Sequence, residues 1–456
     1  MSVFLNTAIS ALDKPSSLAP FFVKDAFDVT GRTVMANNEG GKHEAREKFI
    51  EEAGTSVFWI GGIPAVKWIA DKIAKAKGNI DPDIHFKRIN TTGVQSYFAK
   101  AADGIELGGE KLTQIKQNLS QSKGQYKKYH VGVTTTAVLL NLFMLTVALP
   151  KFNQLLSKKI IEKEVKKEKE DVKAAATFAA LKQKQQNKKA PSFGSLKDIF
   201  NFTKMAENNQ LNVVSNILLL DYGISGSRVT FVPRNKDERV EYAVKEGGII
   251  LFFYYAAGWI KSGLSALADK VFKTPIDLDY NIINDKDFAE KLKAHKDPNE
   301  ILSFVGKDAD ELSVIKLIDK ELAQTKTETP KNKVFNNFTL QMAQKNSLID
   351  VEYDEKLGKW IRHSKKYIET DKVVKLNENL KRFYDQAIKK GGDIEKVIAK
   401  TKVVKVASVL GNLAICCASL SYFLPKLQYL IRTHRTKSSE APGIKHYQEM
   451  AKKNIA

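Results

Sequence analysis

The sequence predicts a mainly α-helical integral membrane protein, built as a tandem duplication with about four membrane segments and a helical soluble insert. The first observation is a pair of uncharged apolar stretches, at residues 131–150 and 406–425. A helix of this length is about 30 Å long, the thickness of a bilayer's hydrocarbon core. The second is an ordered set of motifs that recurs later in the chain, and the third is a polar segment with helical signals at residues 281–400.

The two uncharged stretches, 131–150 and 406–425, are called the clean spans below. They share a sequence motif as well as an apolar composition. Val138-Leu-Leu-Asn141-Leu in the first matches Val409-Leu-Gly-Asn412-Leu in the second, 271 residues later. Both spans end in Leu-Pro-Lys, at Leu149 and Leu424, which are 275 residues apart. The two offsets differ by about one helical turn. A shared Asn, Pro and Lys in the same order favours a common origin over chance.

A weaker apolar segment precedes each clean span, at residues 55–74 and 247–268. Lys67 interrupts the first of these segments and Lys261 interrupts the second. Ala70-Asp-Lys-Ile73 then matches Ala268-Asp-Lys-Val271, and the offset between such matches stays between 193 and 198 residues. Several ordered matches at a nearly constant offset predict an ancient tandem duplication.

These matches divide the chain into five parts. An N-terminal segment covers residues 1–20, and the first repeat covers 21–160. A charged helix and basic linker follow at 161–209, before the second repeat at 210–435 and a basic tail at 436–456. Two spans in each repeat give a parallel duplication, with both termini on one side of the membrane. A model in which the weaker segments are re-entrant or interfacial stays open.

Two further features are expected within this frame. Each repeat should open with a turn, at Gly31-Arg32 and at Gly226-Ser-Arg228, ahead of a charged helix. In the insert, capping residues and apolar periodicity predict helices near Asp285, Pro298 and Asp308, and over residues 334–343 and 375–388. Residues 351–362 suit a short hairpin or a loop.

The strongly positive net charge indicates which anionic partners to expect. The formal net charge is +21. Because Lys and Arg of membrane proteins gather in cytoplasmic loops and contact anionic headgroups, we favour membrane lipids over nucleic acid as partners.

Cys416 and Cys417 are adjacent, and neighbouring helical residues cannot form an ordinary disulfide. The N-terminus lacks the basic start and long apolar core of a signal peptide, so insertion should depend on the internal spans.

The sequence contains no recognisable catalytic, cofactor or metal motif. Gly61-Gly-Ile-Pro lacks the Gly-Lys-Ser/Thr ending of a phosphate-binding loop, and His43-Glu-Ala-Arg-Glu lacks the second histidine of a zinc helix. Residues 223–227 differ from a nucleophile elbow at the final glycine. We therefore expect a protein that is not an enzyme and needs no cofactor.

Eight polar residues beside or within the apolar segments are the candidate site residues. The intramembrane candidates are Asn141, Asn412, Lys67 and Lys261, and the interfacial basic candidates are Arg32, Arg46, Arg228 and Arg239. The asparagines suit interhelical hydrogen bonds or a polar transport site. The lysines suit snorkelling to the interface or pairing with an intramembrane acid. The arginines suit contacts to lipid phosphate or to Glu52 and Glu246.

Three segments carry a resemblance to a group of proteins. Residues 40–52, 58–66 and 239–258 resemble hypothetical helical membrane proteins of uncultured gut bacteria. The resemblance implies a bacterial membrane protein and no known activity. We expect a multi-pass protein of the bacterial inner (cytoplasmic) membrane.

Two functions from different classes follow from these features. The leading hypothesis is a scaffold or interaction protein that recruits a protein partner through its basic loops and helical insert. The alternative is a small transporter or lipid-handling protein with a polar site between the two repeat halves. A lipid-modifying enzyme is a third, weaker hypothesis.

Overall fold

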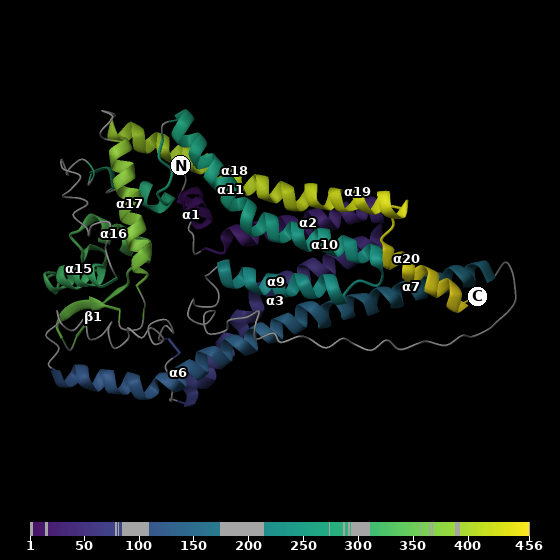
Figure 1. Cartoon of the computed structure of the whole chain (residues 1–456), viewed down its shortest axis with the longest axis horizontal. Coiled ribbons are helices and arrows are strands. Elements are labelled where there is room, and N and C mark those ends of the chain that lie inside the picture. Colours follow the sequence, from purple (N-terminus) through teal and green to yellow (C-terminus); the bar gives the residue numbers. More distant parts are fainter. Residues whose placement is uncertain are drawn as a thin grey trace.

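The computed structural model describes residues 3–13, 17–77, 109–173, 214–285 and 311–455, except for short gaps at 273, 356, 364–365, 367 and 388–392, and a few residues within 80–83 and 288–292. The described chain is mainly helical, and its long helices run side by side along the longest axis (Figure 1). A small unit lies at one end of this bundle, and the C-terminal helix lies at the other.

The first half of the bundle consists of three long helical rods. After α1 (Val3–Asp13) come α2 (Ala19–Gly40) and α3 (Lys42–Lys77), which are antiparallel neighbours. The third rod joins α6 (Gly109–Phe143), the π-helical turn η1 (Met144–Ala148) and α7 (Leu149–Lys173) without a break. The clean span and the start of the charged helix expected after it are therefore one continuous rod.

The second half has the same order of elements. Helix α9 (Val214–Phe231) precedes α10 (Lys236–Ile250), η2 (Leu251–Tyr255), α11 (Ala256–Leu267) and η3 (Ala268–Phe272). The last rod joins α18 (Ile394–Ala418), η5 (Ser419–Phe423) and α19 (Leu424–Thr436), and α20 (Pro442–Ile455) follows. Both η1 and η5 end directly before Leu-Pro. A proline has no N–H for the helical ladder, and a wider π turn fits beside that gap.

Matching contacts accompany the matching elements. The Asn153 side-chain amide donates to the Glu47 carbonyl over 2.8 Å, and the Gln428 amide donates to the Glu241 carbonyl over 3.1 Å. Each of these amides lies three residues after the proline of its rod. Gly54 packs against Leu149 as Gly248 packs against Leu424. The two halves therefore hold their rods together with the same kinds of contact.

Three of the described helices are long and apolar enough to cross a membrane, which indicates a membrane-associated protein. They are Gln125–Lys167, Lys236–Phe272 and Ile394–Thr436. They contain the predicted segments 131–150, 247–268 and 406–425. The segment 55–74 lies in α3, which is not one of the three. Pro64, Lys67 and Asp71 give that segment a more polar character.

The turns expected at the start of each repeat are wrong. Gly31 lies inside α2 and Gly226 inside α9, so neither forms a turn. At Gly31 the missing side chain instead lets α2 approach the backbone of Ser421 in η5. The termini also lie at opposite ends of the bundle (Figure 1), and α2 runs beside α3 as a helix that the sequence did not predict. Because α2 buries charged residues such as Lys24 and Asp28, its sequence lacks the apolar pattern of a buried helix.

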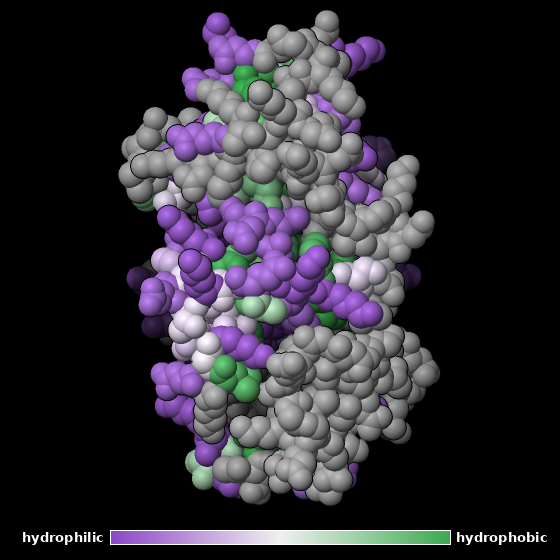
Figure 2. Space-filling view, turned by 90° about the vertical axis from the view of Figure 1, so that its left-hand side faces the viewer, coloured by the Kyte–Doolittle hydropathy of each residue, from purple (hydrophilic) through white to green (hydrophobic). Residues whose placement is uncertain are grey.

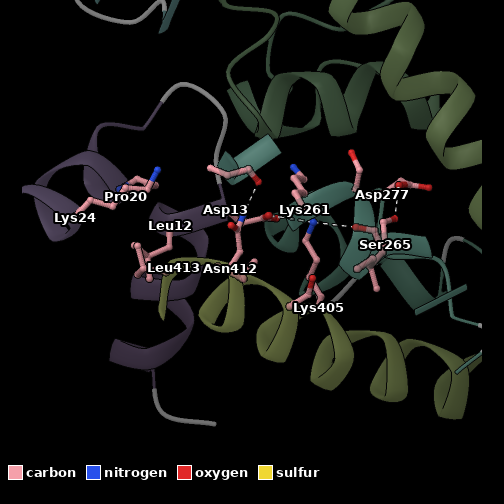
Figure 3. A pocket seen from close by; sticks show the side chains of 15 residues that line it. Leu12, Asp13, Pro20, Lys24, Lys261, Ser265, Asp277, Lys405, Asn412 and Leu413 are labelled. Carbon is pink, nitrogen blue, oxygen red and sulfur yellow. Dashed lines mark hydrogen bonds and ion pairs between the residues drawn. The ribbon is translucent and has the colours of Figure 1, made fainter. Parts of the chain in front are cut away.

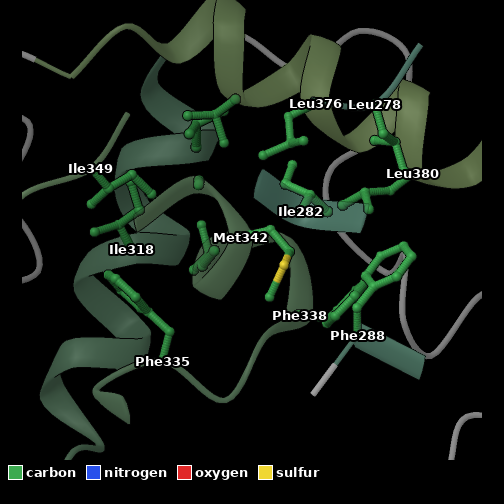
Figure 4. Close-up of a cluster of buried hydrophobic side chains, with 14 of the residues drawn as sticks. Leu278, Ile282, Phe288, Ile318, Phe335, Phe338, Met342, Ile349, Leu376 and Leu380 are labelled. Atoms are coloured by element: carbon green, nitrogen blue, oxygen red, sulfur yellow. The ribbon is translucent and has the colours of Figure 1, made fainter. Parts of the chain in front are cut away.

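The insert has a hydrophobic core of its own. Its described elements are α12 (Tyr280–Ile283), α15 (Glu311–Ala323), η4 (Lys331–Lys333), α16 (Phe338–Lys345), β1 (Val351–Asp354), β2 (Lys359–Arg362) and α17 (Thr370–Ala387). Phe288, Phe338, Met342 and Leu380 are among the buried side chains that meet in its centre (Figure 4). Strands β1 and β2 form an antiparallel hairpin, the first of the two alternatives for 351–362. The helices expected near Pro298 and Asp308 start outside the described residues.

The described residues on the outer face of the insert end are mainly polar. Figure 2 shows mainly hydrophilic residues among those described on this face. Polar side chains also concentrate at the opposite end, where α7, α10 and α19 continue past the apolar segments. The apolar segments therefore lie between two polar ends, as expected for rods that cross a bilayer.

Candidate functional site

A buried network of charges joins the helices at the end of the bundle that carries α20. Arg432 of α19 is 3% exposed and lies between two carboxylates. It donates to Glu44 of α3 over 2.7 Å and to Glu241 of α10 over 2.5 and 2.7 Å. Because one guanidinium binds an acid from each half in bidentate fashion, it fixes the halves relative to one another.

Two further cations connect the same helices. Arg234 donates to Glu47 over 3.0 Å and to Glu238 over 2.6 Å. Burial lowers the pKa of Arg234, whereas the carboxylates of Glu238 and Glu47 raise it. Together the two carboxylates outweigh burial, so the pKa of Arg234 lies above its ordinary value. Lys245 pairs with Glu51 and Glu52 of α3 over 2.8 and 2.7 Å. This end of the molecule is a structural clamp whose charges are already paired with one another.

The four candidate arginines have different surroundings. Arg32 is 3% exposed and donates to Asp28 over 2.6 Å and to Gln428 over 2.9 Å. Arg228 is 2% exposed and contacts Glu246, Thr55 and the Leu145 carbonyl. Both face protein groups in the interior, where lipid phosphate cannot reach them. Arg46 donates to Ser157 over 3.1 Å, and Arg239 is exposed.

A pocket lies between α1, α2, α11 and α18, within the apolar part of the bundle. It encloses about 270 Å³. Three lysines and two aspartates line it, along with Asn412 and several apolar side chains. Figure 3 shows Asp13, Lys261 and Lys405 near its centre, with Lys24 toward one end and Asp277 toward the other. Known ligand pockets enclose about 300–1,000 Å³, so this one suits a small polar group or a lipid headgroup.

Both aspartates of the pocket are paired. Asp13 accepts from the Lys405 ammonium over 3.0 Å and from the Tyr280 N–H over 2.7 Å. Lys405 also donates to the Ile276 carbonyl over 2.9 Å. Asp277 pairs with Arg382 of the insert over 2.7 Å and accepts from Ser265 over 3.1 Å. Neither acid is left to compensate the other two lysines.

Lys24 is a buried cation with no acid beside it. It is 5% exposed, and its ammonium donates to the Phe253 carbonyl over 3.0 Å. The rings of Phe21 and Phe253 lie 5.5 and 5.6 Å from that ammonium. Among the described residues, no carboxylate pairs with it. An ammonium has three N–H donors, and burying one without a counter-ion costs several kcal/mol.

Lys67 and Lys261 differ in whether an acid pairs with them. The Lys67 ammonium pairs with Asp71, one helical turn later, and the Tyr129 hydroxyl donates to the same carboxylate over 2.6 Å. Lys261 lies in the pocket and is exposed, and within the described ranges no acid pairs with it. Intramembrane pairing with an acid therefore describes Lys67 alone.

The two asparagines do not share a site. Asn412 lines the pocket, and its amide donates to the Ala257 carbonyl over 3.2 Å. Asn141 is 2% exposed and donates to the Ala137 carbonyl of its own helix over 2.8 Å. Its side-chain oxygen lies against Gly62, where a larger residue would overlap with it. Asn141 is thus a packing residue between α3 and α6, whereas Asn412 belongs to the pocket.

Four charged residues of the pocket, Lys24, Lys405, Asp13 and Asp277, were not among the predicted site residues. Lys24, Lys405 and Asp13 come together only because α1 and α2 pack against α18, which lies beside α11. One signal was present for Lys24, which lies between Phe21-Phe-Val23 and Ala26-Phe27. A single lysine in such a segment suggests a buried cation. In the described part of the chain, no group of three or more His, Cys, Asp or Glu side chains is arranged to hold a metal ion.

Comparisons with protein-family models, with curated proteins and with solved structures found no match. The function is therefore argued from the chemistry of the pocket.

Proposed function

We propose that this protein is a multi-pass, duplicated helical protein of the bacterial inner membrane that binds an anionic lipid headgroup, without catalysis, in the pocket of Lys24 and Lys261. The lipid-handling alternative from the sequence thus becomes the leading function. The pocket lies beside helices that are long and apolar enough to cross a bilayer. A lipid can present its headgroup there while its tails stay in the hydrocarbon.

The buried, acid-free ammonium of Lys24 carries the proposal. Elsewhere in the described interior, buried cations such as Arg432 and Lys405 have carboxylate partners. A charge without such a partner is costly in a packed apolar region, unless a ligand supplies the opposite charge. Lys261 adds a second unpaired ammonium to the same pocket, and Asn412 adds an amide.

The duplication is supported by contacts that occur in both halves. These are the π turns before Leu-Pro, the amide hydrogen bonds to Glu47 and Glu241, and the glycine–leucine contacts. The pocket draws α2 from the first half and α11 and α18 from the second. It therefore lies where the two halves meet.

The test is lipid-dependent stability of the purified protein in neutral detergent. Phosphatidylglycerol should raise the thermal midpoint of unfolding, and phosphatidylcholine should raise it much less. At a concentration near 100 times Kd, a bound lipid stabilises by about 2.7 kcal/mol. Replacing Lys24→Gln and Lys261→Gln together should remove the extra effect of phosphatidylglycerol. Since these lysines have no acid partner among the described residues, their neutralisation leaves none of those acids unpaired, and the variant should fold.

The control replaces Lys372→Gln and Lys396→Gln, two exposed lysines outside the pocket. This variant loses the same charge and should keep the response. Inorganic phosphate distinguishes the two sources of the anion: a full shift with phosphate alone would indicate a free anion rather than a lipid. If phosphatidylglycerol stabilises the pocket variant as much as the wild type, the proposed site is wrong.

The separate core of the insert favours a second candidate function, the scaffold role. A unit with its own core can present a binding surface outside the bilayer. The two functions differ in their dependence on the pocket. Stoichiometric crosslinking of a soluble partner to the insert that is unchanged in the Lys24→Gln, Lys261→Gln variant would support the scaffold role as independent of lipid.

A further inference from the structure

Helices α3 and α11 carry similar lysines, but the distance from each lysine to the matching acid differs. In α3, Asp71 follows Lys67 by four residues, and the two side chains form an ion pair. Tyr129 of α6 donates to the same carboxylate over 2.6 Å. The protein thus supplies its own anion to Lys67.

In α11 the matching acid is one helical turn farther away. Ser265 follows Lys261 by four residues, whereas Asp269, which corresponds to Asp71 in the matched motif, follows by eight. Eight residues of helix span about 12 Å and four span about 6 Å. Asp269 pairs instead with Arg382 of the insert over 2.7 Å. The acid of the second half is therefore engaged by the insert, and no other acid of the described residues pairs with Lys261.

We infer that this additional turn makes Lys261 the recognition residue for an oxyanion, which takes the place that the Asp71 carboxylate occupies beside Lys67. The inference rests on the proposed function and specifies which chemical group of the ligand binds and where. The ligand's phosphate or carboxylate contacts Lys261, with Lys24 as the second cation. Leu12, Val409 and Leu413 line the same pocket and contact the first carbons of the tail.

The test places an internal anion one turn after Lys261. Ser265 contacts Asp277, but Asp277 is already paired with Arg382, so the new carboxylate of Ser265→Asp should turn to Lys261 and form an ion pair of the Lys67–Asp71 type. It then competes with the ligand, so affinity for phosphatidylglycerol should fall about tenfold or more, a change of about 1.4 kcal/mol. Ser265→Asn has a similar size without the charge, and its affinity should stay within about threefold of wild type. The readout is phosphatidylglycerol bound per chain, titrated in neutral detergent by native mass spectrometry.

The reciprocal change is Asp71→Asn, which frees Lys67. It should raise the number of phosphatidylglycerol molecules bound per chain from one to two. An unchanged count would show that an unpaired lysine at this position does not suffice, which contradicts the inference. Thermal unfolding of each variant without lipid checks that it is folded.

The two proposals fail in different ways. If Lys24→Gln with Lys261→Gln leaves binding intact, the pocket itself is wrong. If that variant loses binding but Ser265→Asp binds as tightly as Ser265→Asn, the pocket stands and the inference about Lys261 and its missing acid is overturned.

Discussion

Replacing Arg432 by alanine is expected to lower the free energy of unfolding by about 3–5 kcal/mol. Its guanidinium forms ion pairs with both Glu44 and Glu241, and the paired side chains of Arg432, Glu44 and Glu241 are between 2% and 8% exposed. Alanine leaves two buried carboxylates close together, without the guanidinium that lay between them. The loss should appear as a lower midpoint in denaturant or thermal unfolding of the purified protein.

Arg435 of the same helix is the matched control. It pairs with Asp237 over 3.0 Å, but both side chains are more than two-fifths exposed. Exposed pairs contribute about 1 kcal/mol or less, so Arg435→Ala should have little effect. Equal losses in the two variants would mean that Arg432 does not clamp the halves together.

Gly31→Ala is expected to destabilise the protein by about 1–3 kcal/mol, because it overpacks a close helix contact. An added Cβ would lie 2.5 Å from the Ser421 carbonyl oxygen and 2.7 Å from its Cα. These are backbone atoms of η5, so they cannot move aside as a flexible side chain could. The stability of purified Gly31→Ala against wild type is the measurement.

Gly226 provides the comparison, since it holds the corresponding place in the sequence match. A Cβ at Gly226 would meet nothing within 4 Å. Alanine favours a helix interior over glycine by about 0.5–1 kcal/mol, so Gly226→Ala should be neutral or slightly stabilising. The account of Gly31 would be contradicted if both substitutions had the same effect.

The elements that depend on local pattern were predictable. The three helices that are apolar enough to cross a membrane contain the segments 131–150, 247–268 and 406–425, and the hairpin at 351–362 was one of two alternatives. Lys261 and Asn412 stood out because polar residues are rare in such segments. They prove to line the same pocket.

The rest depends on packing between distant segments. The sequence near Gly31 resembles a turn signal, yet the glycine is needed for contact with a helix almost four hundred residues later. Arg32 and Arg228 look interfacial until the helices that bury them are in place. The pocket lysine Lys24 has no local partner to reveal its role. Local spacing cannot show which residues α1 and α2 bring to α11 and α18.

Lipid binding in the pocket requires that the rod α18–η5–α19 crosses the bilayer, because this places the pocket beside lipid. The measurement is cysteine labelling with an impermeant maleimide in oriented membranes, in a Cys416→Ala, Cys417→Ala background. Lys333→Cys lies in the insert and Lys445→Cys in α20, and both positions are exposed at opposite ends of the bundle. Lys236→Cys is a control at the α20 end, where Asn235 donates to the Pro442 carbonyl over 3.0 Å. If the rod crosses the bilayer, Lys236→Cys and Lys445→Cys label from one side of the membrane and Lys333→Cys from the other. Labelling of Lys333→Cys and Lys445→Cys from the same side would contradict it.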